Sequence, residues 1–275
     1  MTDETIIVKP SRRWDLGDIR EIWKYRELLY VLTWRDIKVR YKQTLLGIIW
    51  VIFQPSATTV VFTIFFGNLA KIPSGNLPYS LFVLSGLVFW SFFSNSLSNA
   101  SGSLTANEGI IKKVYFPKII LPLASITISF FDFLINLVIL FIFAFILGFY
   151  PSISALLIIP LAIIITSISA AGLGFFLASV NVKYRDVRYI LPYFIQILLF
   201  LSPIIYPLTI VSSRNKYILA LNPMTAVVET VRTIFSHSPI TNIDLILISI
   251  SISILIFIFG YLYFKKTEKY ISDEI

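Results

Sequence analysis

Six long apolar stretches divide this 275-residue chain, and each is long enough to cross a membrane as a helix. About 30 Å of hydrocarbon requires about 20 helical residues at about 1.5 Å per residue. The stretches are Leu45–Ala70, Tyr79–Ala100, Ile119–Gly148, Ser154–Val180, Ile190–Val211 and Ile243–Phe264. They predict an all-α membrane protein with six transmembrane helices, in agreement with a composition that is 57% hydrophobic and only 14% charged.

Basic residues are distributed very unevenly between the connecting segments. If the N-terminus is inside, both termini are inside, and 19 of the 23 Lys/Arg fall on that side. Cytoplasmic loops carry such an excess, so we expect a multi-pass protein of the bacterial cytoplasmic (inner) membrane with both termini cytoplasmic. The net charge of +8 then suits anionic headgroups rather than nucleic acid. The predicted parts are a cytoplasmic N-terminal segment (1–44), the transmembrane domain (45–264) and a cytoplasmic tail (265–275).

The sequence offers little chemistry of its own. It has no cysteine and a single histidine, His237, so we expect no metal cluster and no general acid–base catalysis. None of the 11 glycines is followed by lysine, so the phosphate-binding pattern G-x-x-x-x-G-K-[ST] is absent. We expect no bound cofactor and no enzymatic activity. Energy for transport must come from another subunit, unless the protein is a passive pore.

Residues 17–40 combine charges of both signs with apolar and aromatic side chains at helical spacing. This pattern predicts an amphipathic helix at the cytoplasmic interface. It serves either as a membrane-surface anchor or as a docking surface for a cytosolic partner. In the first span, Gln54-Pro55 interrupts the apolar pattern and predicts a bend, because proline removes a backbone hydrogen bond.

Polar side chains inside the predicted spans must face other helices or water. The second span ends in a Ser/Asn run from Ser94 to Ser103, which either joins helices or lines a hydrophilic path. In the third span, four polar residues share one helical face. They are Ser125, Ser129, Asp132 and Asn136. For Asp132, near the middle of the membrane, three roles stay open: a structural hydrogen-bond partner, part of a transport path, or a proton relay.

Small residues in the fourth span repeat at the same spacing, which predicts close helix packing. They are Ser167, Ala171, Gly174 and Ala178.

The segment from Leu201 to Asn242 is apolar but broken by prolines, so no full span fits there. Irregular backbone near a membrane must be covered by protein or face water. We expect short re-entrant helices at the outer face, around Ser202–Val211 and Thr225–Phe235. On the second of these, Glu229 and Arg232 are three residues apart and are able to pair with each other.

Four blocks of this sequence resemble ABC-2-type permeases that export polysaccharides such as O-antigen, teichoic acid and capsule-like glycans. The blocks are WRDIKVRYKQTLLGIIWVIFQP (Trp34–Pro55), NEGIIKKVYFPKIILPLA (Asn107–Ala124), YRDVRYILPYFIQILLFLSPIIYP (Tyr184–Pro207) and LNPMTAVVETVR (Leu221–Arg232). They occur in the order of that family and extend over nearly the whole chain.

The resemblance implies a homodimer with two copies of a separate nucleotide-binding subunit, which holds ATP and Mg²⁺. It implies that the Trp14–Arg40 helix and the Asn107–Lys118 loop contact this ATPase. The docking residues would be Trp34, Arg35, Asn107, Glu108, Lys112 and Lys113. It also implies a periplasmic gate. The gate residues would be Pro203, Pro207, Asn222, Pro223, Glu229 and Arg232.

Aromatic side chains acquire a possible role from this resemblance, because sugar rings pack their C–H faces on flat aromatic surfaces. The alternative for such residues is ordinary contact with lipid. The candidate glycan path consists of Trp50, Phe53, Phe89, Phe93, Ser129, Asp132 and Asn136.

Our interpretation is the membrane subunit of an ATP-driven exporter of a lipid-linked polysaccharide. Three alternatives stay open: an ABC-2 permease for a drug or other small lipid-like molecule, a proton-coupled carrier that uses Asp132, and a structural scaffold for envelope enzymes.

Overall fold

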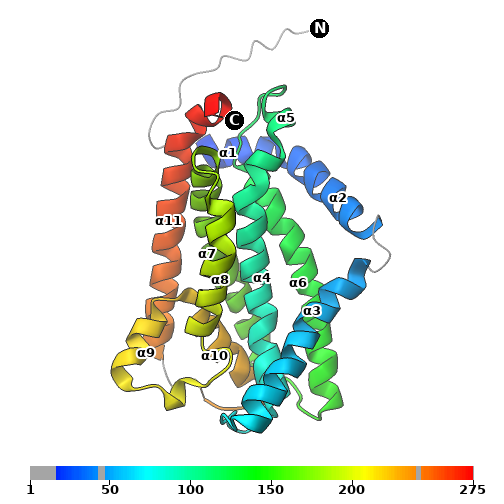
Figure 1. The fold of residues 1–275 in the computed structure, drawn as a ribbon, viewed down its shortest axis with the longest axis vertical. Coiled ribbons are helices and arrows are strands. Elements are labelled where there is room, and N and C mark those ends of the chain that lie inside the picture. The colour runs from blue at the N-terminus through cyan, green and yellow to red at the C-terminus, as the bar shows by residue number, and fades with distance from the viewer. Residues whose placement is uncertain (1–16, 43–46, 240–242, 275) are drawn as a thin grey trace.

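The computed structural model describes residues 17–42, 47–239 and 243–274, and within them it contains helices and no strand (Figure 1). In chain order the helices are α1 (Gly17–Lys24), α2 (Arg26–Lys42), α3 (Gly47–Phe62), the π-helix η1 (Thr63–Leu69), α4 (Tyr79–Ala106), α5 (Glu108–Ile111), α6 (Ile120–Ile146), α7 (Ala155–Lys183), α8 (Val187–Leu201), the 3₁₀ turn η2 (Leu208–Ile210), α9 (Ser213–Ala220), α10 (Pro223–Ser236) and α11 (Ile243–Glu274).

The predicted spans are confirmed as helices, but the fifth is shorter than expected. In the described residues, five helices are long and apolar enough to cross a membrane: α3 with η1, α4, α6, α7 and α11. The chain makes its fifth passage along α8, which has only 15 residues and ends at Leu201. Ser202 has an extended backbone because it precedes Pro203, and this ends the helix.

α4 is the centre of the bundle and packs against α6, α7 and α10. Phe89, Phe92 and Phe93 of α4 are almost completely buried, and Phe133 of α6 lies 5.0 Å from the rings of both Phe89 and Phe92. The interior of the bundle is therefore filled by side chains.

Two glycines set the crossing of α7 and α11. A Cβ built on Gly172 would lie 2.6 Å from Cα of Phe257, and one built on Gly260 would lie 1.9 Å from the carbonyl oxygen of Gly172. Only glycine permits this approach. The close packing predicted for the fourth span is confirmed at Gly174, whose built Cβ would lie 2.9 Å from Cβ of Ala100.

α9 and α10 lie at the end of the bundle opposite α1, α5 and the C-terminal end of α11 (Figure 1). The helix predicted around Thr225–Phe235 is confirmed as α10. The prediction of a helix over Ser202–Val211 is wrong: only Leu208–Ile210 form a 3₁₀ turn, and the neighbouring helix is α9. Pro203 and Pro207 lack the N–H groups that a helix there would use.

The N-terminal amphipathic helix is two helices, α1 and α2, which meet at Tyr25. α1 lies across one end of the bundle, whereas α2 slopes down its side toward α3 (Figure 1), so the single continuous helix that was predicted is divided in two at Tyr25. α3 continues through Pro55 and widens into η1 at Thr63.

Candidate functional site

Asp132 lies near the middle of α6, roughly 18 Å from its Ile120 end at about 1.5 Å per residue. Two consecutive residues of α2 reach it: the Arg40 guanidinium donates to Oδ2, and the Tyr41 hydroxyl donates to Oδ1. We call Arg40, Tyr41 and Asp132 the Asp132 cluster. Asp132 is only 6% exposed, and buried carboxylates are tolerated when paired in this way. The structure thus supports the first of the three roles considered for Asp132, that of a hydrogen-bonded structural partner.

A second polar residue of the third span joins two helices: Ser129 accepts a hydrogen bond from Asn99 of α4 at 3.0 Å. Asn136 is buried, and its Oδ1 has no hydrogen-bond partner among the described residues. In the polar run of the second span, the backbone carbonyl of Ser101 accepts a hydrogen bond from Asn181 Nδ2 of α7. These contacts favour interhelical hydrogen bonding over an open hydrophilic path through one chain.

The two predicted docking segments meet at the end of the bundle that carries α1 and α5. Arg35 Nη2 of α2 donates to Asn107 Oδ1 at 3.0 Å, although the residues are 72 positions apart. Next to Asn107, the Glu108 carboxylate accepts a hydrogen bond from Lys112 Nζ at 2.6 Å. Trp34 is 45% exposed, and Lys113 is exposed. Together these six predicted docking residues form what we call the inner surface.

The Glu108–Lys112 pair is stable at neutral pH. The hydrogen bond from Lys112 lowers the pKa of the Glu108 carboxyl below its ordinary value. A carboxyl with a lowered pKa keeps its ion pair until the pH falls through that pKa. The Glu108 carboxyl is therefore ionised at neutral pH and able to pair with Lys112.

The predicted gate residues form a buried anchor around α10. Arg232, 5% exposed, donates to the carbonyls of Phe82 (3.2 Å) and Ile204 (2.8 Å) and to Glu229 (3.2 Å). Its guanidinium also lies 3.4 Å from the centre of the Phe82 ring. The pairing of Glu229 with Arg232 is thus present, and Arg232 additionally ties α10 to α4 and to the Pro203–Pro207 segment.

Asn222 adds a second link between α10 and that segment. It caps α10 by accepting from Met224 N at 3.0 Å, and its Nδ2 donates to Ser202 Oγ at 2.8 Å. Pro223 is buried at the first turn of α10, a position that suits proline. Pro203 is buried and Pro207 is partly buried.

The four aromatic residues proposed for the glycan path fall into two groups. Trp50 and Phe53 are 56% and 54% exposed on α3, and their rings meet edge to face at 5.4 Å. Phe89 and Phe93 are buried in the core of the bundle. The prediction that Phe89 and Phe93 line a path does not agree with their positions, because they present no surface to a substrate.

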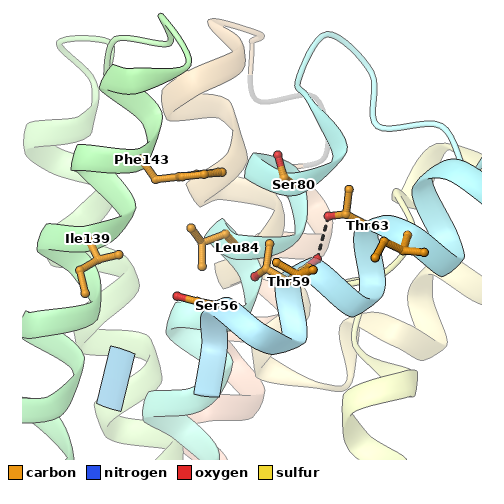
Figure 2. A pocket seen from close by; sticks show the side chains of 9 residues that line it. Ser56, Thr59, Thr63, Ser80, Leu84, Ile139 and Phe143 are labelled. Carbon is orange, nitrogen blue, oxygen red and sulfur yellow. Dashed lines mark hydrogen bonds between the residues drawn. The ribbon is translucent and has the colours of Figure 1, made fainter. Parts of the chain in front are cut away.

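A cavity of about 250 Å³ between α3, α4 and α6 was not predicted (Figure 2). Its lining includes Ser56 and Thr59 of α3 and Thr63 at the start of η1, whose spacing of three and four residues is the sequence signal that marks one helical face. Thr59 donates to the carbonyl of Pro55, and Thr63 to that of Thr59. The rest of the lining is largely apolar and includes Leu84 and Phe143. The cavity suits an apolar group better than a sugar.

Comparisons with known proteins agree with the resemblance of the four sequence blocks. The family model described as ABC-2 type transporter matches residues 27–236. The chain is 29% identical over 214 residues to an O-antigen export system permease protein RfbA of Klebsiella pneumoniae. These residues make up 78% of this chain and 82% of that protein. It is 28% identical to RfbA of Myxococcus xanthus over 219 residues, or 79% and 83% of the two chains. It is 25% identical to the polysialic acid transport protein KpsM of Escherichia coli over 198 residues, or 72% and 77%.

Proposed function

This chain belongs to the ABC-2 type transporter family, and on that premise we propose that it exports a lipid-linked polysaccharide as the permease subunit of an ABC transporter. It is a multi-pass protein of the bacterial inner membrane. Membership in the family implies pairing with an ABC ATP-binding subunit and a permease that is not itself catalytic. O-antigen and capsule-like glycans are the cargo class that its relatives' names support.

The observation that carries the coupling part of the proposal is the hydrogen bond between Arg35 and Asn107. It joins α2 to the start of α5, so that the two docking segments form one inner surface. A helical surface with exposed Trp34, Lys112 and Lys113 offers both apolar and charged contacts to a soluble ATPase. We place this surface, the N-terminus and the C-terminus in the cytoplasm, as the distribution of Lys/Arg favours.

The packed interior of the single-chain bundle supports the proposal that two copies of the permease form the passage. Phe89 and Phe93 fill the interior, whereas α3 exposes Trp50 and Phe53, and α8 exposes Tyr189 and Tyr193. We propose that these faces of α3 and α8 meet across a homodimer and that two ATPase subunits bind below. The glycan then passes between the copies, over weak contacts that allow it to slide.

The test is transport into inverted membrane vesicles that contain the permease and its ATPase. Lipid-linked glycan extracted from the same cells should accumulate inside when ATP is added, and an ATPase variant unable to hydrolyse ATP should abolish accumulation. Uptake without the ATPase subunit would contradict the proposal. Uptake of small hydrophobic drugs but not of glycan would support the drug-permease alternative instead.

Docking is tested by Lys112→Glu combined with Lys113→Glu. This charge reversal should reduce co-purification of the ATPase at least tenfold and leave the amount of permease in the membrane unchanged. The matched control is Arg214→Glu with Lys216→Glu on α9, at the opposite end of the bundle, which should co-purify normally. Equal loss in both double variants would contradict the position of the docking surface.

A further inference from the structure

The Asp132 cluster connects a peripheral helix to the middle of a membrane span. Arg40 and Tyr41, at the C-terminal end of α2, bind the two oxygens of a carboxylate 92 and 91 residues further along the chain. The Arg40 side chain is 38% exposed, while the Asp132 side chain is only 8% exposed. The buried negative charge of Asp132 is therefore on α6, within the bundle, and the groups that neutralise it are on α2, at the side of the bundle.

This connection resists separation because of where the carboxylate lies. An ionised carboxylate without partners is strongly unfavourable in apolar surroundings, far more so than a broken ion pair at a water-exposed surface. If the end of α2 moved away alone, Asp132 would lose both of its donors. Movement of α2 therefore carries α6 with it.

Aromatic contacts extend the connection into the core. The Tyr41 ring meets the Phe131 ring edge to face at 5.8 Å. On the other side of Asp132, Phe133 lies 5.0 Å from Phe89 and from Phe92 of α4. A displacement of Asp132 would move α4 as well, because the rings of Phe133, Phe89 and Phe92 are in contact and packed interiors transmit strain.

α2 also contacts the inner surface, at a second point. Five residues before Arg40, Arg35 of the same helix donates to Asn107, which immediately follows α4. α2 is thus held at the inner surface through Arg35 and at the middle of α6 through Arg40 and Tyr41.

We infer that the Asp132 cluster is the coupling joint that converts displacement of α2 by the bound ATPase into movement of α6 and α4. Arg40, Tyr41 and Asp132 are positioning residues in this role and need no contact with the glycan. The inference rests on the proposed function, since it assumes that an ATPase docks at the inner surface.

The decisive variant is Asp132→Asn, which removes the charge and keeps the size of the side chain. In the complete complex with its ATPase, we expect normal co-purification, ATP hydrolysis within about twofold of wild type, and at least tenfold less glycan exported per ATP hydrolysed. Asp132→Glu should recover part of the export because it restores the carboxylate. The matched control is Asp244→Asn, which removes the charge of a carboxylate that accepts a hydrogen bond from Tyr217 at the opposite end of the bundle and should export normally.

A distance measurement separates a joint from a merely structural contact. The chain contains no cysteine, so Val39→Cys on α2 and Val138→Cys on α6, both exposed, provide one pair of spin-label sites per chain. Assembly with an excess of unlabelled permease leaves the distance within one chain as the one measured in the proposed homodimer. In otherwise wild-type complex, ATP binding should shift both labels together and leave a narrow distance distribution. With Asp132→Asn, the distribution should broaden when ATP binds.

Three outcomes overturn the inference: wild-type export per ATP in Asp132→Asn, a distance distribution in Asp132→Asn that does not broaden when ATP binds, or a parallel loss of export and ATP hydrolysis in that variant. If Asp132→Asn does not co-purify, Tyr41→Phe takes its place, since it removes only one hydroxyl, and the same export-to-hydrolysis ratio decides. Failure of the wild-type complex to export glycan with ATP would instead refute the proposed function.

Discussion

The central bundle and the α2–α3 flank of this protein differ sharply in how much of their surface they bury. In the most apolar stretch of α4, 78% of residues are buried inside the chain, compared with 11% in the stretch formed by α3 and η1. Both segments are long and apolar enough to span a membrane. The difference shows that the bundle is completed by its own packing, whereas the flank presents its apolar face to lipid or to another chain.

The two regions also treat buried charge differently. Arg232 of the bundle finds all of its partners within the bundle, from Glu229 in its own helix and from the carbonyls of Phe82 and Ile204. Asp132 faces the flank and depends on Arg40 and Tyr41 of α2. The first arrangement fixes an element in place, and the second connects two elements that are able to move together.

The largest effect on stability is expected from Arg232→Met. The substitution keeps much of the side-chain volume but leaves Glu229 and two carbonyls without their donor, which costs about 3–5 kcal/mol. Thermal unfolding of the purified permease in detergent measures this loss, with Arg214→Met on the exposed side of α9 as the control. A melting temperature equal to that of the control would show that Arg232 is not an anchor.

An intermediate effect is expected at the crossing of α7 and α11. Gly172→Ala places a Cβ against the backbone of Phe257 and should destabilise the bundle by about 1–3 kcal/mol. The same substitution at Gly102 of α4 meets nothing within 4 Å and should be neutral or stabilising by up to about 1 kcal/mol. Similar melting temperatures for the two variants would mean that the helices separate at this crossing at little cost.

The smallest effect on stability is expected on the flank, from Trp50→Ala combined with Phe53→Ala. These exposed rings contribute mainly their mutual contact, about 0.5–1.5 kcal/mol. Glycan export should nevertheless fall several-fold more than basal ATP hydrolysis, because the rings belong to the proposed passage between two copies. Leu255→Ala on the exposed side of α11 is the control. A proportional fall in export and hydrolysis would assign the two rings a structural role.

Much of the fold follows from local sequence properties. Long apolar stretches predicted where the spans lie, because apolar character is a local property. A short helix was expected around Thr225–Phe235 after the break at Asn222-Pro223, and the structure shows it as α10 with Asn222 as its N-cap. The pair Glu229–Arg232 was also accessible, since residues three apart on a helix are neighbours. The helix expected at Ser202–Val211 failed because apolar character alone does not compensate for Pro203 and Pro207.

Sequence patterns gave less information on the candidate site. The polar face of the third span was visible in the sequence, but the partners of Asp132, Arg40 and Tyr41, were not. The close backbone contact between Gly172 and Gly260 was not predicted either. Phe89 and Trp50 are both aromatic residues in apolar spans, yet one is buried in the core and the other lies on the surface.

The sequence by itself determined that this chain has the long apolar helices of a multi-pass membrane protein and where most of those helices lie. These properties depend on composition and on neighbours within one or two helical turns. The tertiary structure decided which polar groups neutralise one another and which apolar faces stay uncovered. Both depend on contacts between residues far apart in the chain, which no local pattern records.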